Sequence, residues 1–151
     1  MPKACSLAPC IGAVLLAVAP GFAVAALEGA PTDAPAAKVQ RAAGVTSAGI
    51  AYTDITRTLR SGTVVHEFVD AGGAVFAVTW SGPFKPDLKR LLGRHFDRLQ
   101  DGGGTRKADR AHVDVQDSDI VVQSGGHMGA FEGRAWVPSR LPAGFDTQEM
   151  K

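Results

Sequence analysis

The chain has 151 residues, with 16 Lys and Arg against 15 Asp and Glu and a formal net charge of +1. This balance argues against a nucleic-acid binder, which needs a basic excess to neutralise phosphates. The length favours a single domain, and a hydrophobic content of 45% can supply its core.

The first 25 residues are predicted to be a cleaved export signal. Lys3 is the only charge before Glu28, an apolar run follows from Ile11 to Ala19, and small residues stand at Ala23 and Ala25. This order predicts cleavage after Ala25. The apolar run is shorter than the roughly 20 residues that a membrane-spanning helix needs, so a retained anchor is the less favoured alternative.

Cleavage at this site changes the expected chemistry of the chain. It removes Lys3 and both cysteines, Cys5 and Cys10, which leaves equal numbers of basic and acidic residues. An exported domain without cysteines has no disulfide and depends on its apolar core. We expect a periplasmic or secreted protein that binds neither nucleic acid nor, once the signal is removed, the membrane.

Residues 26–49 are predicted to be a flexible lead. They are rich in Ala, Pro and Gly, and Pro31 and Pro35 are incompatible with a regular helix. Such a composition buries too little apolar surface to offset the cost of ordering. One weak helical turn from Ala36 to Ala43 is the alternative. Residues 50–146 are then predicted to form one domain, and residues 147–151 a tail.

Three strands joined by short turns are predicted at the start of the domain. β-Branched and aromatic residues favour extended backbone in each strand, and glycines mark the turns. In the third strand, Phe76, Val78 and Trp80 alternate with Val75 and Ala77, which predicts two apolar faces and a central place in the sheet. The three strands are Ile50–Thr58, Thr63–Val69 and Ala74–Trp80.

The hydrophobic period then changes to that of a helix of about 14 residues. Pro86-Asp87 suits the start of the helix, and Gly102-Gly103-Gly104 its end. A solvated helix face is the expected role of its basic residues, and an anionic surface is the alternative partner. The apolar stripe is Leu88, Leu91, Leu92, His95, Phe96 and Leu99, and the basic residues are Lys89, Arg90, Arg94 and Arg98.

Three further strands are predicted after the helix, with Gly125-Gly126 as a two-residue hairpin turn between the last two. The β-β-β-α-β-β-β order predicts an α+β fold, in which one amphipathic helix packs on a face of an antiparallel sheet. These strands are His112–Gln116, Ile120–Ser124 and Met128–Val137.

Several motifs in this domain resemble an uncharacterised bacterial family of exported proteins, domain-of-unknown-function family 2844. The likeness covers about residues 50–145, and it implies export and a shared fold but no activity. The motifs are Ser61–Val69, Val75–Pro83, Leu91–Phe96, Ser124–Met128 and Phe131–Ala135.

No catalytic, metal or cofactor motif emerges from the sequence. The histidines His66, His95, His112 and His127 lack paired metal-ligand spacing, and Asp114, Asp117 and Asp119 lack the calcium-loop pattern and indicate a turn. His66 and Glu67 are adjacent on a strand and should point to opposite faces. Ser124 lacks the preceding glycine of a nucleophile elbow, because Val122 stands there.

Three residues are candidates for contact with a ligand or partner: Trp80, Arg134 and Trp136. Both indoles lie near strand ends, where one side can stay exposed. Arg134 and Trp136 are two residues apart and share a strand face, so they can rim a groove for an anionic or peptide ligand. The alternative is that both indoles belong to the core under the helix.

We therefore expect a small exported binding or interaction module, with an unknown protein or small-molecule partner in the cell envelope and no cofactor. An envelope enzyme is one alternative, and its site would be assembled only in the fold. An assembly factor that pairs a partner strand with an open sheet edge is the other.

Overall fold

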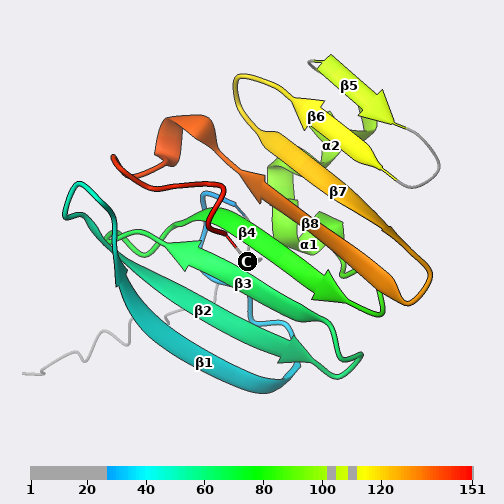
Figure 1. The fold of residues 1–151 in the computed structure, drawn as a ribbon, viewed down its shortest axis with the longest axis horizontal. Coiled ribbons are helices and arrows are strands. Elements are labelled where there is room, and N and C mark those ends of the chain that lie inside the picture. The colour runs from blue at the N-terminus through cyan, green and yellow to red at the C-terminus, as the bar shows by residue number, and fades with distance from the viewer. Residues whose placement is uncertain (1–26, 102–104, 109–111, 151) are drawn as a thin grey trace, which may run out of the picture.

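The computed structural model describes residues 27–101, 105–108 and 112–150. In these residues the chain forms eight strands in one antiparallel sheet, with the order β1-β2-β3-β4-β8-β7-β6-β5 (Figure 1). The strands are β1 Ala36–Val45, β2 Ala51–Leu59, β3 Val64–Val69, β4 Val75–Gly82, β5 Thr105–Ala108, β6 Val113–Gln116, β7 Val121–His127 and β8 Ala130–Trp136.

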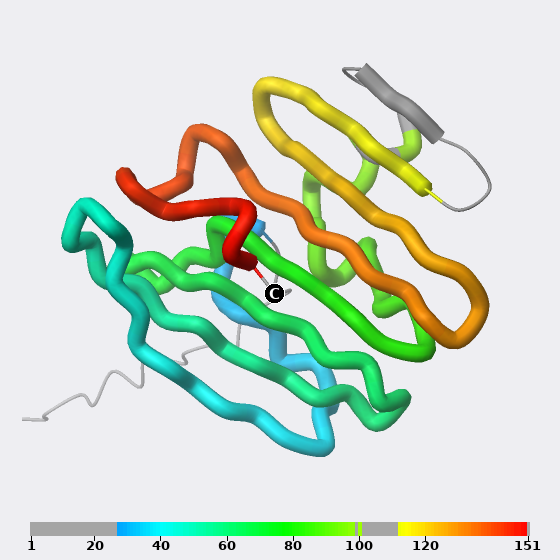
Figure 2. Tube along the Cα trace, in the orientation of Figure 1, coloured from blue at the N-terminus to red at the C-terminus, as the bar shows by residue number. Residues whose placement is uncertain are grey.

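The six predicted strands are present with shifted ends, and the antiparallel sheet with helical turns on one face confirms the α+β class, whereas the strand order and the helix differ in detail. The structure adds two edge strands, β1 and β5, to the predicted order. The tube in Figure 2 shows how β2, β3 and β4 each turn back beside the preceding strand, and how β8, later in the chain, returns next to β4.

The predicted flexible lead is wrong for residues 27–49. Residues 36–45 form β1, which pairs with β2 along its length, and Leu27 is buried in the core. Backbone hydrogen bonds join Leu27 N to Leu91 O and Glu28 N to Val75 O. Small residues alone predict low order, but pairing with a neighbouring strand supplies the missing stabilisation. The predicted signal, residues 1–25, lies outside the described residues.

The predicted helix is interrupted. It consists of α1 (Leu88–Leu92), a 3₁₀ turn η1 (Gly93–His95) and α2 (Phe96–Asp101). Asp87 caps its start as predicted, because its side chain accepts a hydrogen bond from Arg90 N. Gly93 has φ 53° and ψ −125°, a conformation open to glycine, and this ends α1. The predicted stop at Gly102-Gly103-Gly104 and the side chain of Leu99 lie outside the described residues.

The hairpin between β7 and β8 turns at a different place from the predicted one. Gly125 and Gly126 lie within β7, and His127 pairs with Ala130, so Met128 and Gly129 form the turn. Gly129 has φ 88°, a value that glycine adopts without steric cost. Gly125-Gly126 and Gly129 can both form a turn. The pairing of β7 with β8 places the turn at Gly129.

Two apolar clusters lie on opposite faces of the sheet. The helix covers the back face, where Trp80, Leu91 and Leu92 pack together, and the segment after β8 covers part of the front face with Phe145 and Met150 (Figure 1). The predicted tail therefore includes a core residue, Met150.

The strict alternation predicted for β4 is also wrong. The register of β3 with β4 shifts between Phe68 and Val69. As a result, Phe76 and Ala77 both join the front cluster, whereas Val75 and Val78 join the back cluster. A bulge of this kind breaks the two-residue period on which the prediction relied.

Candidate functional site

A row of polar side chains crosses the front face of the sheet. In the strand register, Asp114 of β6 lies opposite Gln123 of β7, Gln123 opposite Arg134 of β8, and Arg134 opposite Thr79 of β4. The row continues to His66 of β3. Directly opposed residues share a sheet face, so five strands place their polar groups side by side.

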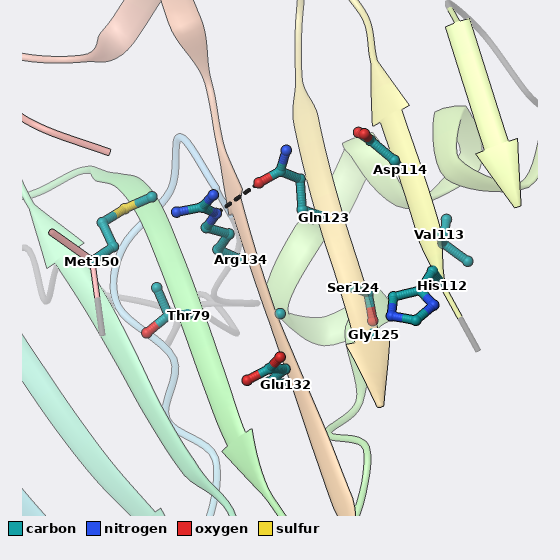
Figure 3. A pocket seen from close by; sticks show the side chains of 11 residues that line it. Thr79, His112, Val113, Asp114, Gln123, Ser124, Gly125, Glu132, Arg134 and Met150 are labelled. Atoms are coloured by element: carbon teal, nitrogen blue, oxygen red, sulfur yellow. Dashed lines mark hydrogen bonds between the residues drawn. The ribbon is translucent and has the colours of Figure 1, made fainter. Parts of the chain in front are cut away.

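A hollow of about 520 Å³ lies over this row, beside the segment that covers the rest of the front face. Figure 3 shows Arg134, Gln123 and Asp114 across three neighbouring strands, with Glu132 nearer the hairpin end. The lining residues are Thr79, His112, Val113, Asp114, Gln123, Ser124, Gly125, Glu132, Gly133, Arg134 and Met150.

Arg134 is fixed by neutral acceptors. Its Nε donates to Gln123 Oε1 at 2.7 Å, its Nη1 to Thr147 O at 2.9 Å, and its Nη2 to Gln148 Oε1 at 3.4 Å. In the described part of the chain, no carboxylate forms an ion pair with it. Because a guanidinium has five N–H donors, Arg134 keeps both its charge and donor capacity for a further acceptor.

Asp114 supplies the opposite charge in the hollow. Its Oδ1 atom is buried and has no hydrogen-bond partner among the residues that the structure describes. A buried polar atom without a partner costs roughly 1–3 kcal/mol, and more when charged, so this oxygen calls for a donor. His112 closes the same end of the hollow, since its ring lies over Gly125, where an added Cβ would be 2.8 Å from His112 Cδ2.

The two candidate indoles lie on opposite faces. Trp80 is 2% exposed in the back cluster and packs against Gly133, so the expectation of a partly exposed indole is wrong for it. Trp136 lies under the Arg134 guanidinium, 5.8 Å from its ring centroid, as the shared face predicts. Trp136 packs against the front cluster and is not part of the hollow's lining. Only Arg134 of the three lines the hollow.

His66 and Glu67 point to opposite faces, as predicted. His66 Nδ1 lies 3.0 Å from the Asp54 carboxylate on the front face. Glu67 is buried on the back face, where it accepts from Arg57 Nε at 2.8 Å. Burial raises the pKa of Glu67, and the hydrogen bond from Arg57 opposes that rise. Neither His66 nor Glu67 lines the hollow.

The remaining histidines and basic helix residues have structural contacts. His95 Nε2 lies 3.0 Å from Glu28 Oε2, and burial, followed by the charge of Arg94, lowers the pKa of His95. His127 Nδ1 contacts Met128 O in the exposed hairpin turn.

Three of the four basic residues of the helix face, for which an anionic surface is the alternative partner, pair within the chain, and the fourth, Lys89, is exposed as a solvated face predicts. Arg90 pairs with Asp33, Arg94 with Glu28, and Arg98 with both Asp117 and Asp119.

A family model described as a protein of unknown function matches residues 23–150. The chain belongs to the DUF2844 family. No curated protein and no solved structure matches it. The motifs that indicated this family lie within the matched range.

Sequence reasoning found Arg134 but missed the other charged groups of this DUF2844 hollow. Glu132 and Arg134 share a face by their spacing, which was a usable signal. Asp114 and Gln123 reach the same row only through the pairing of β6, β7 and β8, which the sequence does not specify.

In this DUF2844 chain, the hollow presents carboxylate, amide and guanidinium groups that can accept and donate hydrogen bonds. Within the described residues, no three His, Cys, Asp or Glu side chains are placed to hold a metal ion. No helix in the same residues has the length and apolar character needed to cross a membrane.

Proposed function

We propose that this DUF2844 chain is an exported binding module that takes a short zwitterionic ligand of the peptide class in the front hollow. The observation that carries the proposal is the buried Oδ1 of Asp114, which has no hydrogen-bond partner among the described residues. It lies two strands away from Arg134, which pairs with no carboxylate among the same residues. A ligand ammonium can pair with the Asp114 carboxylate, which lines the hollow, and a ligand carboxylate can pair with the Arg134 guanidinium.

The spacing of the strands sets the length of the ligand. Two strand separations place the backbones of Asp114 and Arg134 about 10 Å apart. An extended chain advances by roughly 3.3–3.6 Å per residue, so a tripeptide has its termini at about this separation. Gln123 lies between the two charged residues and offers an amide for the middle of the ligand.

The proposed compartment is the periplasm or the exterior. It is supported by the basic, apolar and small-residue order of residues 1–25, which predicts removal of the segment before the domain functions. The intact mass of protein recovered from the envelope fraction tests this part. A chain that starts at Ala26 supports export, whereas a full-length cytosolic chain contradicts it.

The ligand class is tested by titrating the protein with trialanine and following backbone amide shifts by NMR. We expect shifts in β6, β7 and β8 around Asp114, Gln123 and Arg134, and none with acetyl-trialanine amide, which lacks both terminal charges. Asp114→Asn keeps the shape but removes the charge, and should weaken binding by about tenfold or more.

Asp33→Asn is the matched control, because Asp33 is an exposed aspartate bound to Arg90 and lies outside the hollow. It should leave trialanine binding unchanged. Equal binding of the charged and the blocked peptides, or no binding of either, would overturn the proposed ligand class.

A further inference from the structure

The outer edge of β1 is a long, open strand edge. β1 has ten residues and ends the sheet, and β2 is its only strand neighbour in the described chain. Most of its residues are exposed, and the opposite edge strand, β5, has four residues. Open edges of this length present unpaired N–H and C=O groups that can pair with another strand.

Contacts with distant parts of the chain hold β1 at both ends. Before it, Thr32 N donates to the buried Glu67 at 2.8 Å. After it, Thr46 Oγ1 donates to Ala143 O at 2.7 Å, and Ser47 Oγ to Gly144 O at 2.9 Å. The edge is therefore ordered before any partner arrives, which lowers the entropy that pairing must lose.

We infer that the occupant of this edge is a second copy of the chain, paired antiparallel about a two-fold axis at Gln40. The axis places Lys38 opposite Ala42 and Val39 opposite Arg41, so no two charges oppose each other. An axis one residue later would set Arg41 against itself, which is unfavourable. An axis at Val39 pairs a shorter stretch of the strand.

Charge complementarity favours the second copy at this register. Ala42 lies opposite Asp54 of β2, so the partner's Lys38 joins a cross-strand row that ends at the Asp54 carboxylate. Only the methyl group of Ala42 stands between them. The two backbones are about 10 Å apart, a gap that a lysine and an aspartate side chain bridge together. The two-fold axis supplies this contact twice.

Small side chains leave the outer edge of β1 accessible to a second strand. Ala36, Ala37, Ala42, Ala43 and Gly44 make up half of β1. Lys38 and Arg41 form no ion pair with any described residue, so both cations are available to the second copy. An isologous contact of this type closes after two copies and does not propagate.

A cysteine placed on the axis tests the pairing. In a Cys5→Ser, Cys10→Ser background, Gln40→Cys brings two thiols opposite each other, within the Cα range that a disulfide spans. We expect Gln40→Cys to form a covalent dimer under mild oxidation. Met128→Cys is the control, because Met128 is 91% exposed in a hairpin away from β1, and this variant should form no covalent dimer.

Light scattering of the unmodified chain gives the second measurement. We expect the mass of two chains, and we expect Ala42→Lys to shift it to one, since it sets an ammonium opposite Lys38; Ala42→Ser should leave the dimer intact. A monomer at every concentration, or equal cross-linking of both cysteine variants, overturns the inference. So does a monomer whose β1 amides shift only with an added acidic peptide, which would assign the edge to another protein.

Discussion

At the scale of single residues, Arg57 and Glu67 form a buried ion pair in the core. Glu67 is 2% exposed and accepts hydrogen bonds from Arg57 and from the backbone of Thr32. The pair thus ties β2, β3 and the segment that leads into β1. Removal of one member of a buried ion pair leaves the other buried and uncompensated.

Glu67→Gln should lower the free energy of unfolding by about 3–5 kcal/mol, because Arg57 loses its counter-charge in the core. Asp33→Asn removes the exposed partner of Arg90 and should cost less than about 1 kcal/mol. Urea denaturation of both variants measures the difference. Equal losses would show that burial adds nothing to the Arg57–Glu67 pair.

Local sequence patterns could place some of the site residues but not others. The two-residue period placed Arg134 and Trp136 on one face, and the structure has their side chains in contact. For Trp80 the place near a strand end was misleading, and the alternative of a core indole under the helix holds, because that place does not reveal which face a helix covers. The local cluster of aspartates predicts only a turn for Asp114, because its place in the polar row depends on two strand pairings remote from its own neighbours in the chain.

At the scale of elements, Gly93 divides the helix into two parts. Its backbone has φ 53° and ψ −125°, and η1 follows directly. The apolar spacing continued through this position, so periodicity alone predicted one helix. The break lets the following Arg94 and His95 both reach Glu28 in the segment before β1.

Gly93→Ala should destabilise the domain by about 1–3 kcal/mol, because an L side chain is strained at this backbone conformation. Lys89→Ala, on an exposed position of α1, should change stability by less than about 0.5 kcal/mol. Thermal unfolding followed by circular dichroism compares the two. An unchanged midpoint for Gly93→Ala would mean that the helix can rearrange into one continuous element.

β1 is the element that sequence reasoning missed most completely. Its Ala and Gly content gives no periodic signal, and few of its side chains enter the core. Its order comes from pairing with β2 and from contacts at Glu67, Ala143 and Gly144, far away in the sequence. Such non-local stabilisation is invisible to a local pattern.

At the scale of the whole molecule, the two faces of the sheet are covered by different segments: the helix lies on the back face, and the segment after β8 lies on part of the front face. On the front, the ring of Phe145 meets those of Tyr52, Phe68 and Phe76 at centroid distances of 5.3, 5.5 and 4.9 Å. These contacts fasten the segment after β8 onto the sheet. The same segment carries Thr147 and Gln148, which hold Arg134 at the hollow.

Phe145→Ala should therefore lower stability by about 3–5 kcal/mol, the range for loss of a packed aromatic side chain. Phe84→Ala is the matched control, because Phe84 is 61% exposed in the loop before the helix, and it should cost little. Guanidinium denaturation gives both values. A small loss for Phe145→Ala would show that the segment after β8 contributes little to the folded state.

The back face is fastened in another way. Beneath its apolar contacts, the helix is linked to the rest of the chain by the Arg90, Arg94 and Arg98 ion pairs, whose arginines are all substantially exposed. Dissolved ions screen such pairs within a few ångströms at high ionic strength, whereas ring contacts are unaffected by screening. Raising the ionic strength should therefore weaken the helix ion pairs by no more than about 1 kcal/mol each, while Leu91 and Leu92 keep the helix packed on the sheet.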